Sequence, residues 1–172
     1  MKHILRPLSF LPALLVMYLI FSLSGQQGDV SSNLSYNISY KAVELGSQIL
    51  KKEFNEEQLS TYADKIHYYV RKTGHMAEYF ILALCVSFPL YVYGLRGLPL
   101  LFIAGIICVS FAALDEFHQS FVAGRTAAVK DVLIDSVGIF LGITVVRIFC
   151  YSILTVFSGG KHKQAKKKRS RR

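Results

Sequence analysis

Four long apolar stretches constrain the fold of this chain more than any other feature. They cover residues 8–23, 76–93, 98–114 and 132–150, and each approaches the roughly 20 residues that a helix needs to cross a bilayer. Inside a membrane only helices and closed barrels satisfy every backbone polar group, and stretches of this length indicate helices. The composition, 52% hydrophobic and 18% charged, is typical of membrane proteins. We predict an all-α fold, a four-helix transmembrane bundle that forms one domain, residues 1–157.

The net charge of +9 does not indicate a nucleic-acid partner, because it is concentrated at one end. Eight of the 20 Lys and Arg residues lie in the last twelve positions, which leaves 12 basic against 11 acidic residues elsewhere. A basic tail beside a membrane span is attracted to anionic lipid and marks the cytoplasmic side. We therefore expect residues 158–172 to form a basic cytoplasmic tail.

Basic residues near the ends of the spans also predict the topology. Lys2 and Arg6 precede the first stretch, Arg96 lies in the tight turn of residues 94–97, and the basic tail follows the fourth. With four spans all of these lie on one side, so we expect a multi-pass protein of the cell membrane with both termini cytoplasmic. An alternative is a secretory signal that ends at Ser22-Leu23-Ser24, whose cleavage would leave three spans in the same orientation.

The long connection of residues 25–72 should then lie outside the cell. Asn55 and Gln58 form a capping-box pattern at a helix start, and Leu59, Tyr62, Ile66 and Tyr69 follow at helical spacing. We predict an extracellular loop whose amphipathic helix lies on the outer leaflet or covers the bundle before the chain turns at Gly74. A second short helix is expected within residues 39–52.

Polar residues gather where the spans meet this outer side. His75, Glu78 and Tyr79 share one face of the second span, and Asp131 and Asp135 share one face of the fourth. Because ionisable groups at membrane depth are costly, their convergence predicts a functional pocket. Simpler interpretations remain for each group: an interfacial histidine, solvated acids at a loop edge, an aromatic belt of tyrosines, or carboxylates that pair with Arg125 to fix the bundle.

Small residues accompany these polar ends. Gly105, Cys108 and Ala112 lie on one face of the third span and lead to Asp115, Glu116 and Gln119. On the fourth span, Gly138 and Gly142 form a small-xxx-small pattern that lets helices approach closely. Arg125 follows Gly124 in the outer hairpin and is a natural partner for a carboxylate or a phosphate.

Three segments resemble the VanZ-like family. They are Asp-Glu-Phe-His-Gln-Ser-Phe-Val-Ala-Gly-Arg (115–125), Asp-Val-Leu-Ile-Asp-Ser-Val-Gly (131–138) and Arg-Lys-Thr-Gly-His-Met-Ala-Glu-Tyr (71–79), with Phe21-Ser22 and Gln26 as a weaker first block. The resemblance covers about residues 8–146. It implies a small membrane protein of the cell envelope in bacteria, mostly Gram-positive ones. The family's name-giving member is associated with resistance to teicoplanin-type glycopeptide antibiotics, but the family implies no chemical mechanism.

By matching positions, the resemblance carries over ten site residues. Asp135 lies where many relatives have Asn, and Ala123 where Pro is frequent, so the sequence departs from the family pattern at these two positions. The residues that we expect to carry proton transfer are His75, Glu78, Glu116 and Asp131. Those that we expect to bind the ligand are Lys72, Tyr79, Asp115, Gln119, Arg125 and Asp135.

Three hypotheses for the function follow. In the leading one, the outer pocket binds, and in one version modifies, a lipid-linked or peptidoglycan-related head group. The second is a metal-assisted hydrolase or transferase that uses His75, Glu78, Glu116, His118 and Asp131. The sequence has no pair of His residues at i, i+4, as many zinc sites do, so we predict no resident metal or cofactor. The third is a non-catalytic protein that shields a cell-wall precursor. Besides membrane lipids and such a precursor no partner is indicated, and the oligomeric state stays open.

Overall fold

Every regular element of the described chain is helical. The computed structural model describes the backbone of residues 7–169 and the side chains of residues 7–152. A short 3-10 turn, η1 (Pro7–Phe10), precedes five α-helices: α1 (Leu11–Ser24), α2 (Gly28–Ile49), α3 (Glu56–Val92), α4 (Gly97–Gln119) and α5 (Val129–Arg169). Lys2, Arg6 and the side chains of the predicted tail lie outside the described residues.

Four helical segments are long and apolar enough to cross a membrane. They are Pro7–Ser24, Glu56–Val92, Gly97–Gln119 and Val129–Ser152. The four predicted spans are thereby confirmed in number and approximate position, and they fit a multi-pass membrane protein. Helix α4 extends five residues beyond the predicted end of its span, so Asp115, Glu116 and Gln119 all lie on the helix and not in the following loop.

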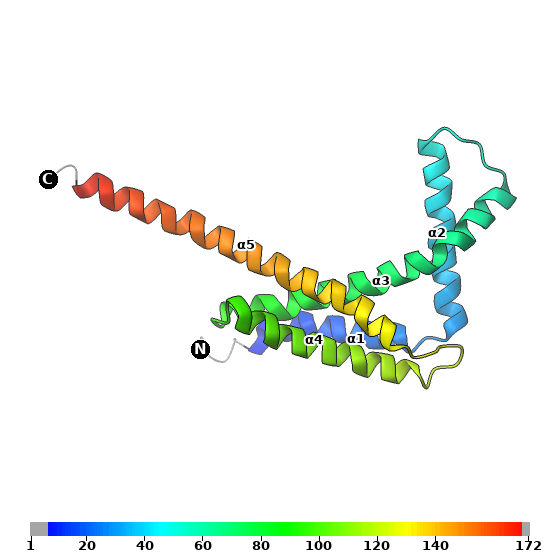
Figure 1. Ribbon diagram of the computed structural model, residues 1–172, viewed down its shortest axis with the longest axis horizontal. Helices are drawn as coiled ribbons and strands as arrows, with labels where there is room; N and C mark the ends of the chain where they lie inside the picture. Colours follow the sequence, from blue (N-terminus) through cyan, green and yellow to red (C-terminus); the bar gives the residue numbers. More distant parts are fainter. Residues whose placement is uncertain (1–6, 170–172) are drawn as a thin grey trace.

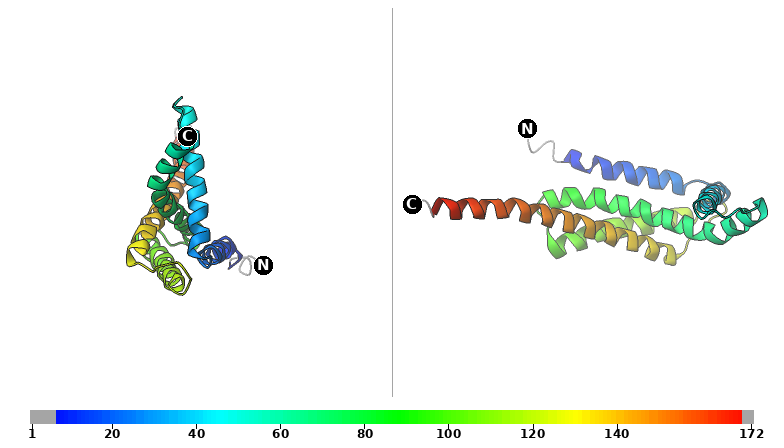
Figure 2. Two further views of the ribbon diagram at one scale, coloured as in Figure 1. Left: turned by 90° about the vertical axis from the view of Figure 1, so that its right-hand side faces the viewer. Right: turned by 90° about the horizontal axis from the view of Figure 1, so that it is seen from above.

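The spans lie alongside one another, and α2 crosses one end of the bundle they form (Figure 1). Helix α3 is central, since it packs against α1, α2, α4 and α5. The start of α1 and the C-terminal part of α5 lie at the opposite end from α2 (Figure 2). We call the end that α2 crosses the α2 end. It is where α1 and α4 finish and α5 begins.

The connection between α1 and the second span differs from the prediction in two ways. The Asn55 capping box is confirmed: the Asn55 side chain accepts from the Gln58 N–H at 2.8 Å, and the Gln58 side chain accepts from the Asn55 N–H at 3.1 Å. The turn at Gly74 is wrong, because α3 runs unbroken from Glu56 to Val92. A glycine inside a helix costs only about 1 kcal/mol, too little to end one that packs along its length. The second helix, α2, is also longer than the expected one.

Glycines set the closest helix contact in the bundle. A Cβ atom on Gly138 would collide with the backbone oxygen of Met76 in α3, and one on Gly142 would lie 2.6 Å from the oxygen of Phe80. The predicted small-xxx-small contact is therefore confirmed, with α3 as the partner of α5. The tight turn between α3 and α4 is confirmed as well, through Gly94 and Gly97 with φ values of 101° and 60°.

Candidate functional site

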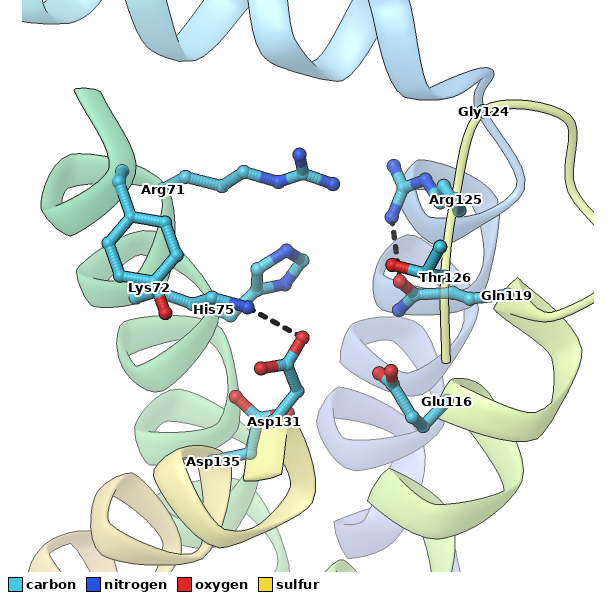
Figure 3. A pocket seen from close by; sticks show the side chains of 11 residues that line it. Arg71, Lys72, His75, Glu116, Gln119, Gly124, Arg125, Thr126, Asp131 and Asp135 are labelled. Carbon is cyan, nitrogen blue, oxygen red and sulfur yellow. Dashed lines mark hydrogen bonds and ion pairs between the residues drawn. The ribbon is translucent and has the colours of Figure 1, made fainter. Parts of the chain in front are cut away.

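A polar cavity of about 210 Å³ lies at the α2 end, between α3, α4, α5 and the loop that joins α4 to α5. Figure 3 shows its side chains converging from these elements. Seven of the ten predicted site residues line it: Lys72, His75, Glu116, Gln119, Arg125, Asp131 and Asp135. The other lining residues are Tyr68, Arg71, Gly124 and Thr126.

Helical periodicity explains why these side chains share one space. On α3, Tyr68, Arg71 or Lys72, and His75 are separated by three or four residues and therefore lie on one face. Asp131 and Asp135 repeat this spacing on α5, and Glu116 and Gln119 on α4. The close contact between Gly138 of α5 and Met76 of α3 lies about one helical turn from Asp135, so it fixes the spacing of these two helices beside the cavity.

Two interactions connect the walls of the cavity. Lys72 of α3 forms an ion pair with Asp131 of α5, with 2.5 Å between Nζ and Oδ2. Glu116 of α4 accepts a hydrogen bond from the backbone N–H of Ala128 at 2.6 Å. The second contact fixes the end of the α4–α5 loop against the helix that precedes it. Both carboxylates are thus engaged within the protein.

Arg125 is anchored in the loop by neutral acceptors. Its guanidinium donates to the backbone oxygens of Gln26 (3.0 Å) and Leu23 (3.3 Å) and to the side-chain oxygen of Gln119 (2.9 Å). Burial lowers the pKa of the Arg125 guanidinium from its ordinary value, and the positive charge of Arg71 lowers this pKa further. The carboxylates of Asp115, Glu116 and Glu78 oppose this lowering from a distance, but among the described residues none of them forms an ion pair with Arg125.

Close backbone packing positions this loop. The N–H of Gly28, the first residue of α2, donates to the oxygen of Ala123 at 3.1 Å. A Cβ atom on Gly28 would collide with the backbone oxygen of Gly124. Gly124 has a positive φ of 73°, which residues with a side chain rarely adopt. Only glycine tolerates both demands readily. The start of α2 and the loop that carries Arg125 are therefore locked together.

Tyr79 and Asp115, which we predicted to bind ligand, lie in a buried network and do not line the cavity. Oδ2 of Asp115 accepts hydrogen bonds from Ser24 (2.6 Å), Tyr79 (3.2 Å) and Gln119 (3.1 Å). The network connects α1, α3 and α4, and Gln119 links it to Arg125.

His75, which lines the cavity, pairs with Glu78, which does not, with 3.5 Å between Nδ1 and Oε2. A carboxylate in this position orients an imidazole for proton transfer. His118 points elsewhere, because its ring stacks on Phe21 with 4.1 Å between centroids. Among the described residues no three His, Cys, Asp or Glu side chains lie close enough to hold a metal ion. The ligand set named in the metal-assisted hypothesis is not assembled.

Arg71 and Tyr68 are lining residues that the sequence analysis missed. The sequence contained a signal for both residues, because Arg71 and Tyr68 lie one and two helical turns before His75 on the same face of α3. Within the described part of the chain the Arg71 side chain makes no hydrogen bond or ion pair. Figure 3 shows its guanidinium pointing across the cavity toward that of Arg125.

Comparison with known families identifies the chain's relatives. A family model described as VanZ/LLP1 matches residues 9–150. The chain belongs to the VanZ/LLP1 family. Comparisons with curated proteins and with solved structures found no match. The VanZ/LLP1 match spans all four membrane helices and every residue that lines the cavity, so the resemblance seen in the sequence is confirmed as family membership.

Proposed function

We propose that this VanZ/LLP1 protein acts in the bacterial cell envelope, where its polar cavity binds the head group of a lipid-linked or peptidoglycan-related molecule. The observation that carries the proposal is the cavity itself. Six charged side chains and a histidine surround one space at the end of an apolar bundle. Ionisable groups are rare at membrane depth and usually mark a site of function.

The distribution of basic residues supports an outward-facing cavity. Arg96 lies in the α3–α4 turn, at the end of the bundle opposite to α2. The N-terminal basic residues and the basic tail belong to that same side in a four-span topology. The proposed arrangement therefore has both termini in the cytoplasm and the α2 end at the outer leaflet of the cell membrane.

The size of the cavity limits what it can hold. Its volume of about 210 Å³ is below the roughly 300–1,000 Å³ that is usual for drug-sized ligands. One compact group fits, such as a phosphate with a short substituent or a single amino acid. The remainder of a lipid-linked ligand would then lie against the lipid-facing surface of the spans.

Two versions of this function differ in chemistry. In the binding version the protein sequesters a cell-wall precursor and denies it to a glycopeptide such as teicoplanin. In the catalytic version the His75–Glu78 pair, with Glu116 or Asp131, donates a proton to the bound head group or accepts one from it. Release of a chemically altered head group by the purified protein would favour catalysis, and recovery of the intact ligand would favour sequestration.

The test is a head-group and lipid binding screen with the full-length protein in detergent. The informative variant is Arg71→Gln, because it removes a cavity charge without breaking a described hydrogen bond. We expect it to weaken binding of anionic ligands about tenfold, the effect of one lost charge-assisted hydrogen bond. The matched control, Arg96→Gln at the opposite end, should bind as the wild type does. Equal binding by all three proteins, or no binding at all, would contradict the proposal.

A cellular assay tests the link to antibiotic resistance. If the family resemblance extends to phenotype, expression of the wild-type protein should raise the teicoplanin concentration that a susceptible Gram-positive host tolerates. Arg71→Gln should lose this protection, and Arg96→Gln should keep it, at equal amounts of membrane-inserted protein. If expression of the wild-type protein leaves teicoplanin susceptibility unchanged, this family member has no role in resistance, and the binding result still stands.

A further inference from the structure

Apart from Lys72, which pairs with Asp131, the charged side chains of the cavity are separated by sign. In Figure 3 the guanidinium groups of Arg71 and Arg125 lie nearest α2, and the carboxylates of Glu116, Asp131 and Asp135 lie further into the bundle. The cations come from α3 and the α4–α5 loop, and the acids come from α4 and α5. A ligand that enters from the α2 end therefore meets positive charge first and negative charge at the bottom.

Most of these charges already have partners inside the protein. Lys72 and Asp131 form an ion pair, Glu116 accepts the Ala128 N–H, and Arg125 donates to three neutral oxygens. Two charged residues that line the cavity have neither a hydrogen bond nor an ion pair among the described residues. They are Arg71 of α3 and Asp135 of α5, whose charges have opposite signs.

Asp135 is buried although it has no partner. It is only 6% exposed. Among the charged groups around it, His75 and Lys72 attract its carboxylate and Asp131 and Glu116 repel it, but none of them forms an ion pair with it. A carboxylate withdrawn from water without a cation in direct contact is costly, and a ligand ammonium would relieve that cost. The side chain is therefore placed to receive a positive group that arrives through the cavity.

Arg71 and Arg125 present the converse situation. Two guanidinium groups that face each other across a partly desolvated space repel, and Arg125 cannot withdraw because backbone oxygens hold it. Burial, and after it this repulsion, lowers the pKa of the Arg125 guanidinium. An anion between the two groups would replace repulsion with two charge-assisted hydrogen-bonding contacts.

We infer that the cavity recognises a zwitterionic head group. Its anion lies between Arg71 and Arg125, and its primary ammonium lies against Asp135. This inference rests on the proposed function and narrows it to one ligand chemistry. Two sources supply that chemistry: a phospholipid head with phosphate and amine, and an amino acid or peptide end with carboxylate and amine.

The test compares soluble probes that carry one or both charges, by calorimetry on the full-length protein in detergent. Phosphoethanolamine carries both, glycerol 3-phosphate carries only the anion, and ethanolamine carries only the cation. Alanine and lactate form the second pair, since lactate has a hydroxyl in place of the ammonium. We expect the zwitterion of at least one pair to bind about tenfold more tightly than its singly charged counterparts. The pair with the larger ratio identifies the source.

Asp135→Asn isolates the ammonium contact. We expect this variant to bind phosphoethanolamine or alanine no more tightly than the matching anion-only probe, while glycerol 3-phosphate binds as it does to the wild type. The matched control is Asp64→Asn, on the part of α3 that lies beyond the cavity, where the side chain is exposed. It should keep the full preference for the zwitterion.

The outcomes separate this inference from the proposed function. Wild-type protein that binds anion-only probes as tightly as zwitterions would overturn the inference and leave an anion-binding cavity. The inference would also be overturned if the Asp135→Asn variant still binds zwitterions more tightly than anion-only probes. Wild-type protein that binds none of the probes, and no lipid in the binding screen, would overturn both.

Discussion

Replacement of Gly138 by alanine is the sharpest test of how the bundle is assembled. The added methyl group would collide with the backbone oxygen of Met76. A backbone atom within a helix cannot rotate away as a side chain can, so α3 and α5 must separate locally. The matched control is Gly74→Ala in α3, where an added methyl group has no heavy atom within 4 Å.

The two variants should change stability in opposite directions. Alanine is favoured over glycine inside a helix by about 1 kcal/mol, and Gly74→Ala should gain this amount. Gly138→Ala gains the same but loses about 2–3 kcal/mol to overpacking, the upper part of the usual range, because the obstructing atom belongs to the backbone. With a net loss of about 1–2 kcal/mol and about 2–4 °C per kcal/mol for a chain of this size, Gly138→Ala should lower Tm by about 2–8 °C.

A thiol-reactive dye gives a suitable readout, because Cys108 is 0% exposed in the folded bundle and reacts when the bundle opens. Both variants and the wild type are heated at one scan rate, since unfolding of membrane proteins is often irreversible. Equal increases in Tm for Gly138→Ala and Gly74→Ala would refute the close contact between α3 and α5.

Three further predictions concern the network, the ion pair and the topology. Tyr79→Phe removes one of the three donors to the buried Asp115 carboxylate and should lower Tm by about 2–4 °C, equivalent to about 1 kcal/mol; an unchanged Tm would show that this hydrogen bond contributes nothing. Lys72→Met leaves Asp131 without its cation, so in a double-mutant cycle with Asp131→Leu the two losses of unfolding free energy should be less than additive, by about 0.5–3 kcal/mol; strict additivity would contradict the ion pair. In a cysteine-free background, a cysteine at position 126 should react in whole cells with a membrane-impermeant thiol reagent and one at position 95 should not; the reverse pattern would invert the proposed topology.

Much of the fold could be predicted because each signal was local. Apolar length determines the spans, the Asn55–Gln58 pair specifies the start of α3, and the Gly138–Gly142 spacing indicates a close helix contact. The continuity of α3 could not be predicted in this way. A lone glycine at position 74 is compatible with a turn and with a helix, and packing against α2 and α5 decides between them.

The site was predicted as a set of residues, but their separate places depend on helix rotation and depth. We could predict that the polar side chains converge at one end of the bundle, because they follow or precede the spans at ends that lie on the same side when four spans alternate in direction. Asp115 belongs to a buried network, and its neighbour Glu116 lines the cavity. The two side chains differ in place because consecutive residues point about 100° apart around a helix. Arg71 was missed because its importance lies in what faces it across the cavity, and no local pattern contains that information.

The uninterrupted course of α3 has a mechanical consequence. Its 37 residues form a rod of about 55 Å, with α2 packed near its N-terminal end and the ion pair of Lys72 near its middle. A molecule that pushes on α2 from outside the membrane would tilt this rod as a stiff lever. Such a force would reach the wall of the cavity directly, with no hinge between them to absorb it.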